Sequence, residues 1–329
     1  MIQLRPIFLC IIFSLCLFTA CDDEESTYTN DANLISMIVA DNANLSQLNT
    51  SLARTEIKNL LLEAGPYTLL APSDDAFKLV GTDPSTAGKS KLTKTISYHV
   101  LDGIYELDKL PFLFNQQIRS RDGGKLFVTR WVRNQDTITT INGAPVSTYK
   151  MHASNGNIQI INRLLEPYQF DYLSDAISNE ADLTLFNQAL QKTDLLKLLA
   201  HEGAYTVYAP SNTAMISYGL SSVELINEKS KEELEKLLRY HIVPDRRFVY
   251  DYILTTPSDP NTFDDLFTTE TMIDGDNVTV TLVPNYSIPG TFTGITLQGT
   301  YNTNAVNLTR ENILTGNGVL HIIDNVLLN

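Results

Sequence analysis

One short stretch of this chain occurs twice. Tyr67–Phe77 reads YTLLAPSDDAF and Tyr205–Met215 reads YTVYAPSNTAM, an offset of 138 residues (205 minus 67). An offset of this size is about one domain length. The repeat therefore indicates two similar units, and it raises the question whether Ser73 and Ser211, which follow the shared Ala-Pro, are catalytic or structural.

Two further segments repeat in the same order. SYHV at Ser97–Val100 returns as RYHI at Arg239–Ile242, an offset of 142 (239 minus 97), and NGNIQIIN at Asn155–Asn162 returns as NGVLHIID at Asn317–Asp324, an offset of 162 (317 minus 155). Three ordered matches define a tandem repeat. We predict domains at residues 32–168 and 169–329, with twenty more residues (162 minus 142) in the later part of the second copy.

Each copy begins with helical patterns and ends with strand patterns. Apolar residues recur at helical spacing from Leu45 to Leu61 and from Leu183 to Leu199, and a glycine follows each run. The capping-box sequence Ser230–Glu233 predicts the start of a later helix. Strands are predicted at 125–132, 137–141, 278–283 and 294–297. Each copy is therefore expected to be an α+β domain.

The repeated Ala-Pro-Ser segment fits a helix cap better than a catalytic loop. A nucleophilic serine needs a base and a strained turn, but the sequence contains no G-x-S-x-G, and the second copy replaces Asp74-Asp75 with Asn212-Thr213. Both copies keep a proline that ends a strand and a serine that can accept N–H bonds from the next helix. We therefore predict Ser73 and Ser211 as structural caps, and no catalytic residues.

His99 and His241 are the histidines that both copies share. Zinc needs three or four converging ligands, so one histidine per copy predicts no metal site. Each follows a tyrosine at the end of a predicted helix. A partly buried imidazole that hydrogen-bonds to the backbone is the expected outcome, and a binding role for each Tyr-His pair is the alternative.

The three repeated segments together resemble the fasciclin domain. Their pattern is Y-T-x-x-A-P-S-x-x-A-[FM], then Y-H-[VI], then N-G-x-[IL]-x-I-I-[ND]-x-[LV]-L, and Ile138–Val146 resembles the strand segment before the second hallmark of that family. The resemblance covers both copies. It implies two tandem α+β domains, each a β-wedge of about seven strands packed with helices, and roles in adhesion or extracellular interaction.

The resemblance also implies candidate binding residues. In adhesive animal members of the family the Tyr-His region has been proposed to contact integrins, which here means Tyr98, His99, Tyr240 and His241. The companion Asp-Ile pair is missing, since the first copy has Lys150-Met151 and the second has Asn312-Ile313. This departure argues against integrin-type adhesion.

The first twenty-one residues resemble a bacterial lipoprotein signal. Arg5 precedes an apolar run from Ile7 to Phe18, which is shorter than the about 20 residues that span a bilayer. Phe18-Thr19-Ala20-Cys21 resembles a lipobox, so we predict a signal peptide at 1–21 and lipidation of Cys21, with plain secretion as the alternative. Residues 22–31 are a predicted acidic, flexible tether, and their DDEE start resembles a signal for export to the surface of Gram-negative bacteria. The expected location is the cell envelope, as a surface-exposed outer-membrane lipoprotein.

The net charge argues against one class of partner, and the cysteine positions bear on how the domains are stabilised. Lys and Arg number 24 against 38 Asp and Glu, a net charge of −14, which makes nucleic acid a poor partner. Cys10, Cys16 and Cys21 all lie in the predicted signal, so the domains are expected to be stabilised without disulfides. The sequence predicts no cofactor.

Two features differ between the copies. Trp131, the single tryptophan, lies in a predicted hairpin among Arg119, Arg121, Lys125, Arg130 and Arg133. An exposed ring here can stack on a sugar or a peptide aromatic while Arg130 and Arg133 hold acidic groups, and burial in the core is the alternative.

The excess of the second copy includes the threonine-rich stretch Thr291–Thr309, which is predicted to be an enlarged hairpin.

These patterns together predict a non-catalytic cell-surface lipoprotein that adheres to or binds an extracellular protein or glycan, with its acylated Cys21 in the membrane. The alternative is an accessory component that captures a glycan or peptide for an outer-membrane uptake system. An enzyme would need a repeated set of acid, base and nucleophile, which the sequence lacks.

Overall fold

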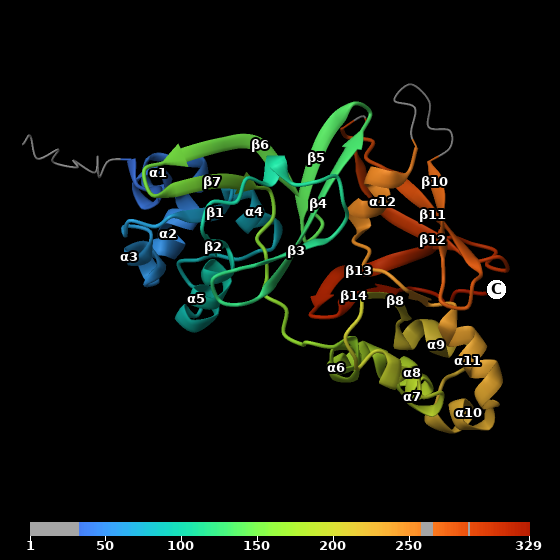
Figure 1. The fold of residues 1–329 in the computed structure, drawn as a ribbon. Helices are drawn as coiled ribbons and strands as arrows, with labels where there is room; N and C mark the ends of the chain where they lie inside the picture. Colours follow the sequence, from blue (N-terminus) through green and yellow to red (C-terminus); the bar gives the residue numbers. More distant parts are fainter. Residues whose placement is uncertain (1–32, 258–265, 289) are drawn as a thin grey trace, which may run out of the picture.

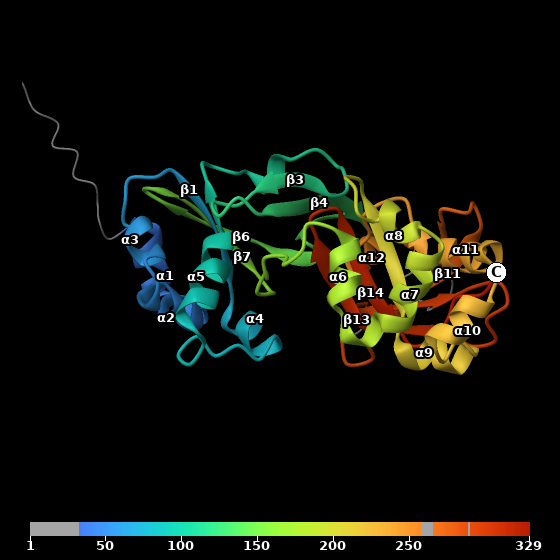
Figure 2. The same ribbon diagram turned by 90° about the horizontal axis from the view of Figure 1, so that it is seen from below.

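The chain folds as two α+β domains that lie next to one another (Figures 1 and 2). The computed structural model describes residues 33–257, 266–288 and 290–329. The predicted signal peptide, the tether and Cys21 lie outside the described residues. Each domain opens with helices and closes with a seven-stranded sheet, so the expected fold class is confirmed.

The first domain, blue to green in Figure 1, begins with a helical half and ends in a run of strands. Its elements are α1 (Ile35–Asp41), η2 (Ala43–Leu45), α2 (Ser46–Arg54), α3 (Ile57–Leu60), β1 (Tyr67–Pro72), α4 (Asp74–Leu79), α5 (Lys89–Tyr98), β2 (Val100–Asp102), η3 (Leu107–Lys109), β3 (Gln116–Arg119), β4 (Lys125–Arg133), β5 (Asp136–Ile141), β6 (Ala144–Ala153) and β7 (Gly156–Ile161).

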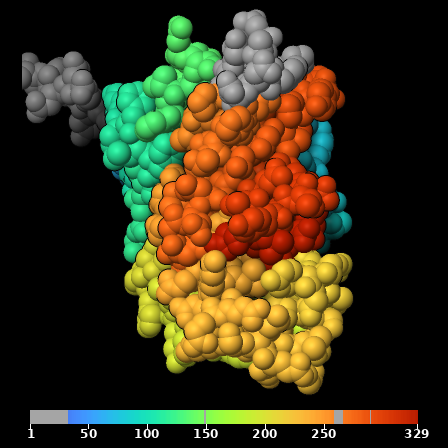
Figure 3. All heavy atoms as spheres, turned by 90° about the vertical axis from the view of Figure 1, so that its right-hand side faces the viewer, coloured from blue at the N-terminus to red at the C-terminus, as the bar shows by residue number. Residues whose placement is uncertain are grey.

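The second domain repeats this order. Figure 3 views it from its free side, with its strands in orange and red above its helices in yellow. Its elements are α6 (Leu173–Asn179), η4 (Ala181–Leu183), α7 (Thr184–Lys192), α8 (Leu195–Leu198), β8 (Tyr205–Pro210), α9 (Asn212–Tyr218), α10 (Val223–Glu228), α11 (Lys231–Arg239), β9 (Ile242–Val243), α12 (Val249–Thr255), β10 (Phe267–Thr271), β11 (Asn277–Pro284), β12 (Phe292–Gln298), β13 (Val306–Thr315) and β14 (Gly318–Ile323).

The two hallmark segments of each copy lie side by side in its sheet. The first sheet has the order β2-β1-β7-β6-β5-β4-β3, and the second has β9-β8-β14-β13-β12-β11-β10 when read in the same sense. β1 pairs in parallel with β7, from Tyr67 opposite Gly156, and β8 pairs in parallel with β14, from Tyr205 opposite Gly318. A Cβ on either glycine would overlap the carbonyl oxygen of the facing tyrosine, so this close approach requires glycine.

The asparagine before each glycine ties the helical half to the sheet. Asn155 Oδ1 accepts the N–H of Ile35 at 2.9 Å, and its Nδ2 donates to the carbonyls of Leu61 at 2.9 Å and Glu63 at 2.8 Å. In the second domain, Asn317 makes the equivalent bonds to Leu173, Leu199 and His201. Both asparagines are 1% exposed, so one buried amide satisfies three backbone groups, two of them in fully buried bonds.

Strand β1 separates two cores in the first domain. Leu69 and Ala71 pack with helices α1 to α3 and α5, whereas Leu70 packs with Tyr98, Leu126 and the strands that curl around it. Successive side chains of a strand point to opposite faces. The uninterrupted apolar sequence of β1 is therefore that of a strand buried on both faces.

The Ala-Pro-Ser segments are strand-to-helix junctions. Ser73 Oγ accepts the N–H of Ala76 at 3.3 Å, and Ser211 Oγ accepts that of Ala214 at 3.2 Å. The residue after each serine caps another helix. Asp74 accepts bonds from the hydroxyl of Ser46 and the N–H of Gln47, and Asn212 does the same for Thr184 and Leu185. Carboxylate and amide oxygens serve alike here, which explains how the acid can be lost in the second copy.

Removal of a cap tests this assignment. We expect Ser73→Ala and Ser211→Ala each to lower the free energy of unfolding by about 1 kcal/mol. Asp74→Asn, which keeps the accepting oxygen as the second domain does, is expected to cost less. Urea denaturation measures all three, and a larger loss for Asp74→Asn than for Ser73→Ala would contradict the capping role of Asp74.

The extra residues of the second copy are shared between two places. Tyr98 Oη donates to the carbonyl of Lys125, and Tyr240 Oη donates to that of Asn277, both at 2.6 Å. These equivalent bonds give an offset of 152 (277 minus 125), so ten residues (152 minus 142) enter before β11 and ten (162 minus 152) after it. The later ten lengthen the connections around β12, and Thr291–Thr309 forms strands as expected. The helix α12, which the sequence patterns did not predict, stands where the first domain has η3, because the equivalent bonds of Thr68 to Gly103 and Tyr105 and of Thr206 to Asp245 and Arg247 keep the offset at 142 up to its start.

Candidate functional site

The two Tyr-His pairs belong to the cores of their domains. Tyr98, His99, Tyr240 and His241 are all 0% exposed. They cannot touch a partner in this structure, which corrects their assignment as candidate binding residues. The physical reason is the position of each pair at the end of a helix (α5 or α11) that packs against the sheet.

Each histidine links its helix to a distant segment. His99 Nδ1 lies 2.8 Å from the carbonyl of Thr95, and its Nε2 accepts the N–H of Leu165 at 3.0 Å. His241 makes the same bonds to Leu237 and Leu327. A carbonyl can only accept and an N–H can only donate, so each imidazole is neutral with its proton on Nδ1. Burial lowers the pKa of both side chains to about 4.

Trp131 and the cationic residues near it in sequence do not form one cluster. Trp131 is half-buried, with its ring 4.7 Å from that of Phe114. Arg130, on the opposite face of β4, donates to the carbonyl of Leu110 at 2.7 Å and stacks on Phe112 at 4.2 Å. Arg133 stacks on Phe292 of the second domain at 4.9 Å. Arg130 therefore faces away from Trp131, and Arg133, on the same face as Trp131, stacks on the second domain instead, so the expected arginine cradle around an exposed tryptophan is wrong.

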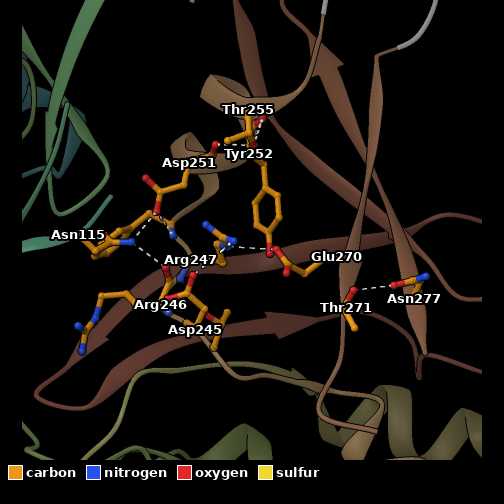
Figure 4. Close-up of polar contacts among 12 residues, drawn as sticks. Asn115, Asp245, Arg246, Arg247, Asp251, Tyr252, Thr255, Glu270, Thr271 and Asn277 are labelled. Atoms are coloured by element: carbon orange, nitrogen blue, oxygen red, sulfur yellow. Dashed lines mark hydrogen bonds and ion pairs between the residues drawn. The ribbon is translucent and has the colours of Figure 1, made fainter. Parts of the chain in front are cut away.

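The face of β4 that carries Thr129 forms the junction between the domains. Thr129 Oγ1 donates to Asp251 Oδ1 at 3.2 Å, and Asn115 Nδ2 donates to Asp251 Oδ2 at 3.3 Å and to the carbonyl of Arg246 at 2.7 Å. The guanidinium of Arg246 lies 3.6 Å from the ring centre of Phe127. Figure 4 shows Asn115 of the first domain pointing at Asp251 and Arg246 of the second.

Asp251 is a buried acid at this junction. Its carboxylate also accepts the N–H of Phe248 at 2.9 Å, which caps the start of α12. Burial raises the pKa of Asp251 to about 6, against the lowering effect of the bonds from Phe248, Asn115 and Thr129. Phe248 packs against Phe127 and Val319, and a Cβ on Gly143 would lie 2.6 Å from Phe248 Cβ. The junction is therefore closely packed and has little room for a larger residue.

A cleft of about 190 Å³ opens beside the junction and is lined by both domains. The first domain contributes Leu79, Gly143, Pro145, Asn162 and Arg163, and the second contributes Val249, Tyr250, Ile253, Phe292, Thr293, Glu311 and Asn312. None of these residues was predicted as a site. The one sequence signal was the threonine-rich stretch Thr291–Thr309 of the second copy, which contains the lining residues Phe292 and Thr293.

The described residues contain neither a metal-binding group nor a membrane-spanning helix. In residues 33–257, 266–288 and 290–329, no group of three or more His, Cys, Asp and Glu side chains could hold a metal ion. No helix in the same part of the chain is long and apolar enough to cross a membrane. The structure therefore directs attention to binding surfaces and to the cleft.

Comparison with known proteins gives consistent relatives. A family model described as "Fasciclin domain" matches residues 43–167 and 181–329. Periostin of Homo sapiens is 26% identical over 280 residues, which cover 84% of this chain and 29% of periostin. Protein sll1483 of Synechocystis is 39% identical over 72 residues, which cover 22% of this chain and 39% of that protein. The chain thus spans less than half the length of these relatives.

Among solved structures, one match is the FAS1 domain pair of the insect cell adhesion molecule Fasciclin I, with a TM-score of 0.40 and 13% identity over 86% of this chain and 96% of that chain. The family assignment itself depends on the family model, which matches most of the chain in two successive regions. The chain therefore belongs to the fasciclin domain family, as a tandem pair of fasciclin domains.

Proposed function

We propose that this chain is a non-catalytic extracellular binding or adhesion protein, tethered to the outer membrane through an acylated Cys21. The observation that supports this best is the use of its histidines. His99 and His241 are buried, neutral and hydrogen-bonded on both nitrogens to backbone, so neither is available as a general base. What the molecule presents to solvent is two closely joined domains with exposed apolar side chains.

The surface that supports adhesion lies at the end of β4 and in the loop before β3. Phe112, Leu113 and Val132 are 45%, 55% and 47% exposed, and Arg130 stacks on Phe112. We call Phe112, Leu113, Arg130 and Val132 the hairpin surface. Aromatic and arginine side chains are enriched at protein interfaces, so this surface suits an extracellular protein as partner.

A variant that introduces negative charge tests the adhesive surface. We expect the double variant Leu113→Asp and Val132→Asp to reduce the retention of cells that display the protein on a partner surface by tenfold or more, because interface centres tolerate buried charge poorly. The matched control is Val223→Asp with Leu225→Asp on α10, where the side chains are 42% and 38% exposed. Equal retention by the two double variants and the unmodified protein would count against the hairpin surface.

The proposed lipid anchor at Cys21 has its own test. Cys21→Ser is expected to abolish incorporation of radiolabelled palmitate and to release the protein from the membrane fraction, because one acylated cysteine is the anchor we propose. Immunoblots of membrane and supernatant fractions follow the protein. Retention of Cys21→Ser in the membrane would contradict the anchor and leave the adhesive surface untouched.

The second candidate function is capture of a glycan or peptide for an uptake system. The cleft between the domains favours it, because a concave site with a few polar groups among apolar side chains is the usual form of a ligand site. Its volume of about 190 Å³ is small, so it suits one unit of a longer chain.

A further inference from the structure

We infer that the cleft between the two domains is a binding site for a single neutral sugar unit, held between Arg163 and Glu311. This inference deepens the second candidate function above and depends on it. It is independent of the hairpin surface, which lies on other elements.

The charged groups of the cleft come one from each domain. Arg163 follows β7 of the first domain and Glu311 lies on β13 of the second, and both line the cleft half-buried. Their charges interact through space, since Arg163 lowers the pKa of Glu311 while burial, the larger effect, raises it. Within the described residues they form no ion pair with each other or with any other group. Burial destabilises the charged form of this carboxylate, and no cation forms an ion pair with it. A hydrogen-bond donor on a ligand would therefore stabilise it.

Glu311 is held in place by its neighbour. Asn312 has a left-handed backbone, with φ of 58°. Its Oδ1 accepts the N–H of Val249 at 2.9 Å, and its Nδ2 donates to Glu311 Oε1 at 3.2 Å. In the part of the chain that the structure describes, Glu311 Oε2 receives no hydrogen bond. One oxygen of the carboxylate is thus fixed by the protein and the other is left for a ligand.

Two aromatic side chains complete the lining. Tyr250 of α12 and Phe292 of β12 both border the cleft, and the guanidinium of Arg133 lies 4.9 Å from the ring centre of Phe292 on the first-domain side. Aromatic rings offer flat apolar faces that suit the C–H faces of a sugar ring. The ring of Phe292 is positioned by the same stacking that joins the domains.

The charge balance of the cleft selects a neutral ligand. An anion would meet Glu311 and a cation would meet Arg163, whereas a hydroxyl can donate to the carboxylate and accept from the guanidinium. A sugar ring carries hydroxyls on opposite edges and can span two groups that do not touch each other. A free amino acid also offers one group to each charge, a carboxylate to Arg163 and an ammonium to Glu311, so glycine serves as the competing probe below.

The binding experiment uses the purified protein with glucose, galactose, mannose and N-acetylglucosamine as separate probes. We expect at least one to bind with a Kd on the order of 1 mM, measured by calorimetry and by saturation-transfer NMR. Glu311→Gln and Arg163→Gln are each expected to weaken binding by about tenfold or more, because each removes a charged hydrogen bond. The matched controls are Lys229→Gln and Glu233→Gln, which remove an exposed ion pair between the end of α10 and α11 and should leave binding unchanged.

A second measurement covers variants that fold poorly. Amide chemical shifts of the unmodified protein should change on addition of sugar at Tyr250, Phe292 and Glu311. Shift changes confined to another surface, equal binding by Glu311→Gln and the controls, or binding of glycine in place of every sugar would each overturn the inference. If no sugar binds while cells still adhere through the hairpin surface, the sugar site fails and the adhesive function stands. If sugar binds in the cleft and cells do not adhere, the sugar site stands and the adhesive function fails.

Discussion

Acidification from pH 6.5 to pH 4 is expected to destabilise both domains, and the second domain more than the first. His99 in the first domain, and His241 and His321 in the second, are 0% exposed, and burial lowers the pKa of each to about 4. The unfolded chain, with histidine pKa values near 6.5, takes up protons first as the pH falls. The stability that each neutral histidine contributes is therefore complete above pH 6.5 and is lost towards pH 4, by about 3 kcal/mol per histidine.

Asp251 acts in the opposite sense. Burial raises its pKa to about 6, so the folded state binds this proton more tightly than the unfolded state does, and protonation below pH 6 stabilises the protein by about 2 kcal/mol. The net loss in the second domain is then about 4 kcal/mol, against about 3 kcal/mol in the first. Asp251→Asn removes this stabilising contribution, so the second domain should lose stability more steeply as the pH falls.

Urea denaturation at pH 7, 5.5 and 4.5, with one tyrosine or tryptophan probe per domain, measures these changes. Trp131 reports on the first domain, since it is the single tryptophan of the chain. Stability that is unchanged or rises between pH 6.5 and pH 4.5 would contradict the assignment of buried neutral histidines.

Substitution of the buried asparagine in each domain is expected to have the second large effect on stability. We expect Asn155→Ala to lower the free energy of unfolding of the first domain by about 4 kcal/mol, and Asn317→Ala to do the same for the second. Each substitution leaves one N–H and two carbonyls without their partner, and the N–H and one of the carbonyls are buried, at about 1–3 kcal/mol for each buried group. The N–H of Ile35 and the carbonyls of Leu61 and Glu63 are the groups affected in the first domain.

The exposed Asn59 provides the control. Its amide contacts Glu56 at 3.4 Å on the surface, so Asn59→Ala should change stability by about 0.5 kcal/mol or less. Thermal and urea unfolding followed by circular dichroism measure all three variants. Asn155→Ala within 1 kcal/mol of Asn59→Ala would show that the helical half is held to the sheet by packing alone.

The sequence predicted most of the local structure of this protein. Helical spacing, strand alternation and the serine caps each depend on residues within about ten positions of one another, and the predicted strands agree with β4, β5, β11 and β12 to within two residues at each end. The repeat predicted the two-domain α+β architecture, and the resemblance added the family. The sequence also predicted a buried imidazole that hydrogen-bonds to the backbone, but it could not name Leu165 as the partner of His99 Nε2, because that contact depends on which face of α5 meets which strand.

Sequence alone therefore determined the repeat, the class of fold and the caps, since these follow from backbone propensity and short-range hydrogen bonds. Tertiary structure decided where the arginines of β4 point, and it placed Asn115 against Asp251, 136 positions further along the chain. It also brought Arg163 and Glu311, from different domains, to the lining of one cleft. No local pattern links such residues, because their meeting depends on how α12 packs against β4, and it is this packing that creates both the junction and the cleft.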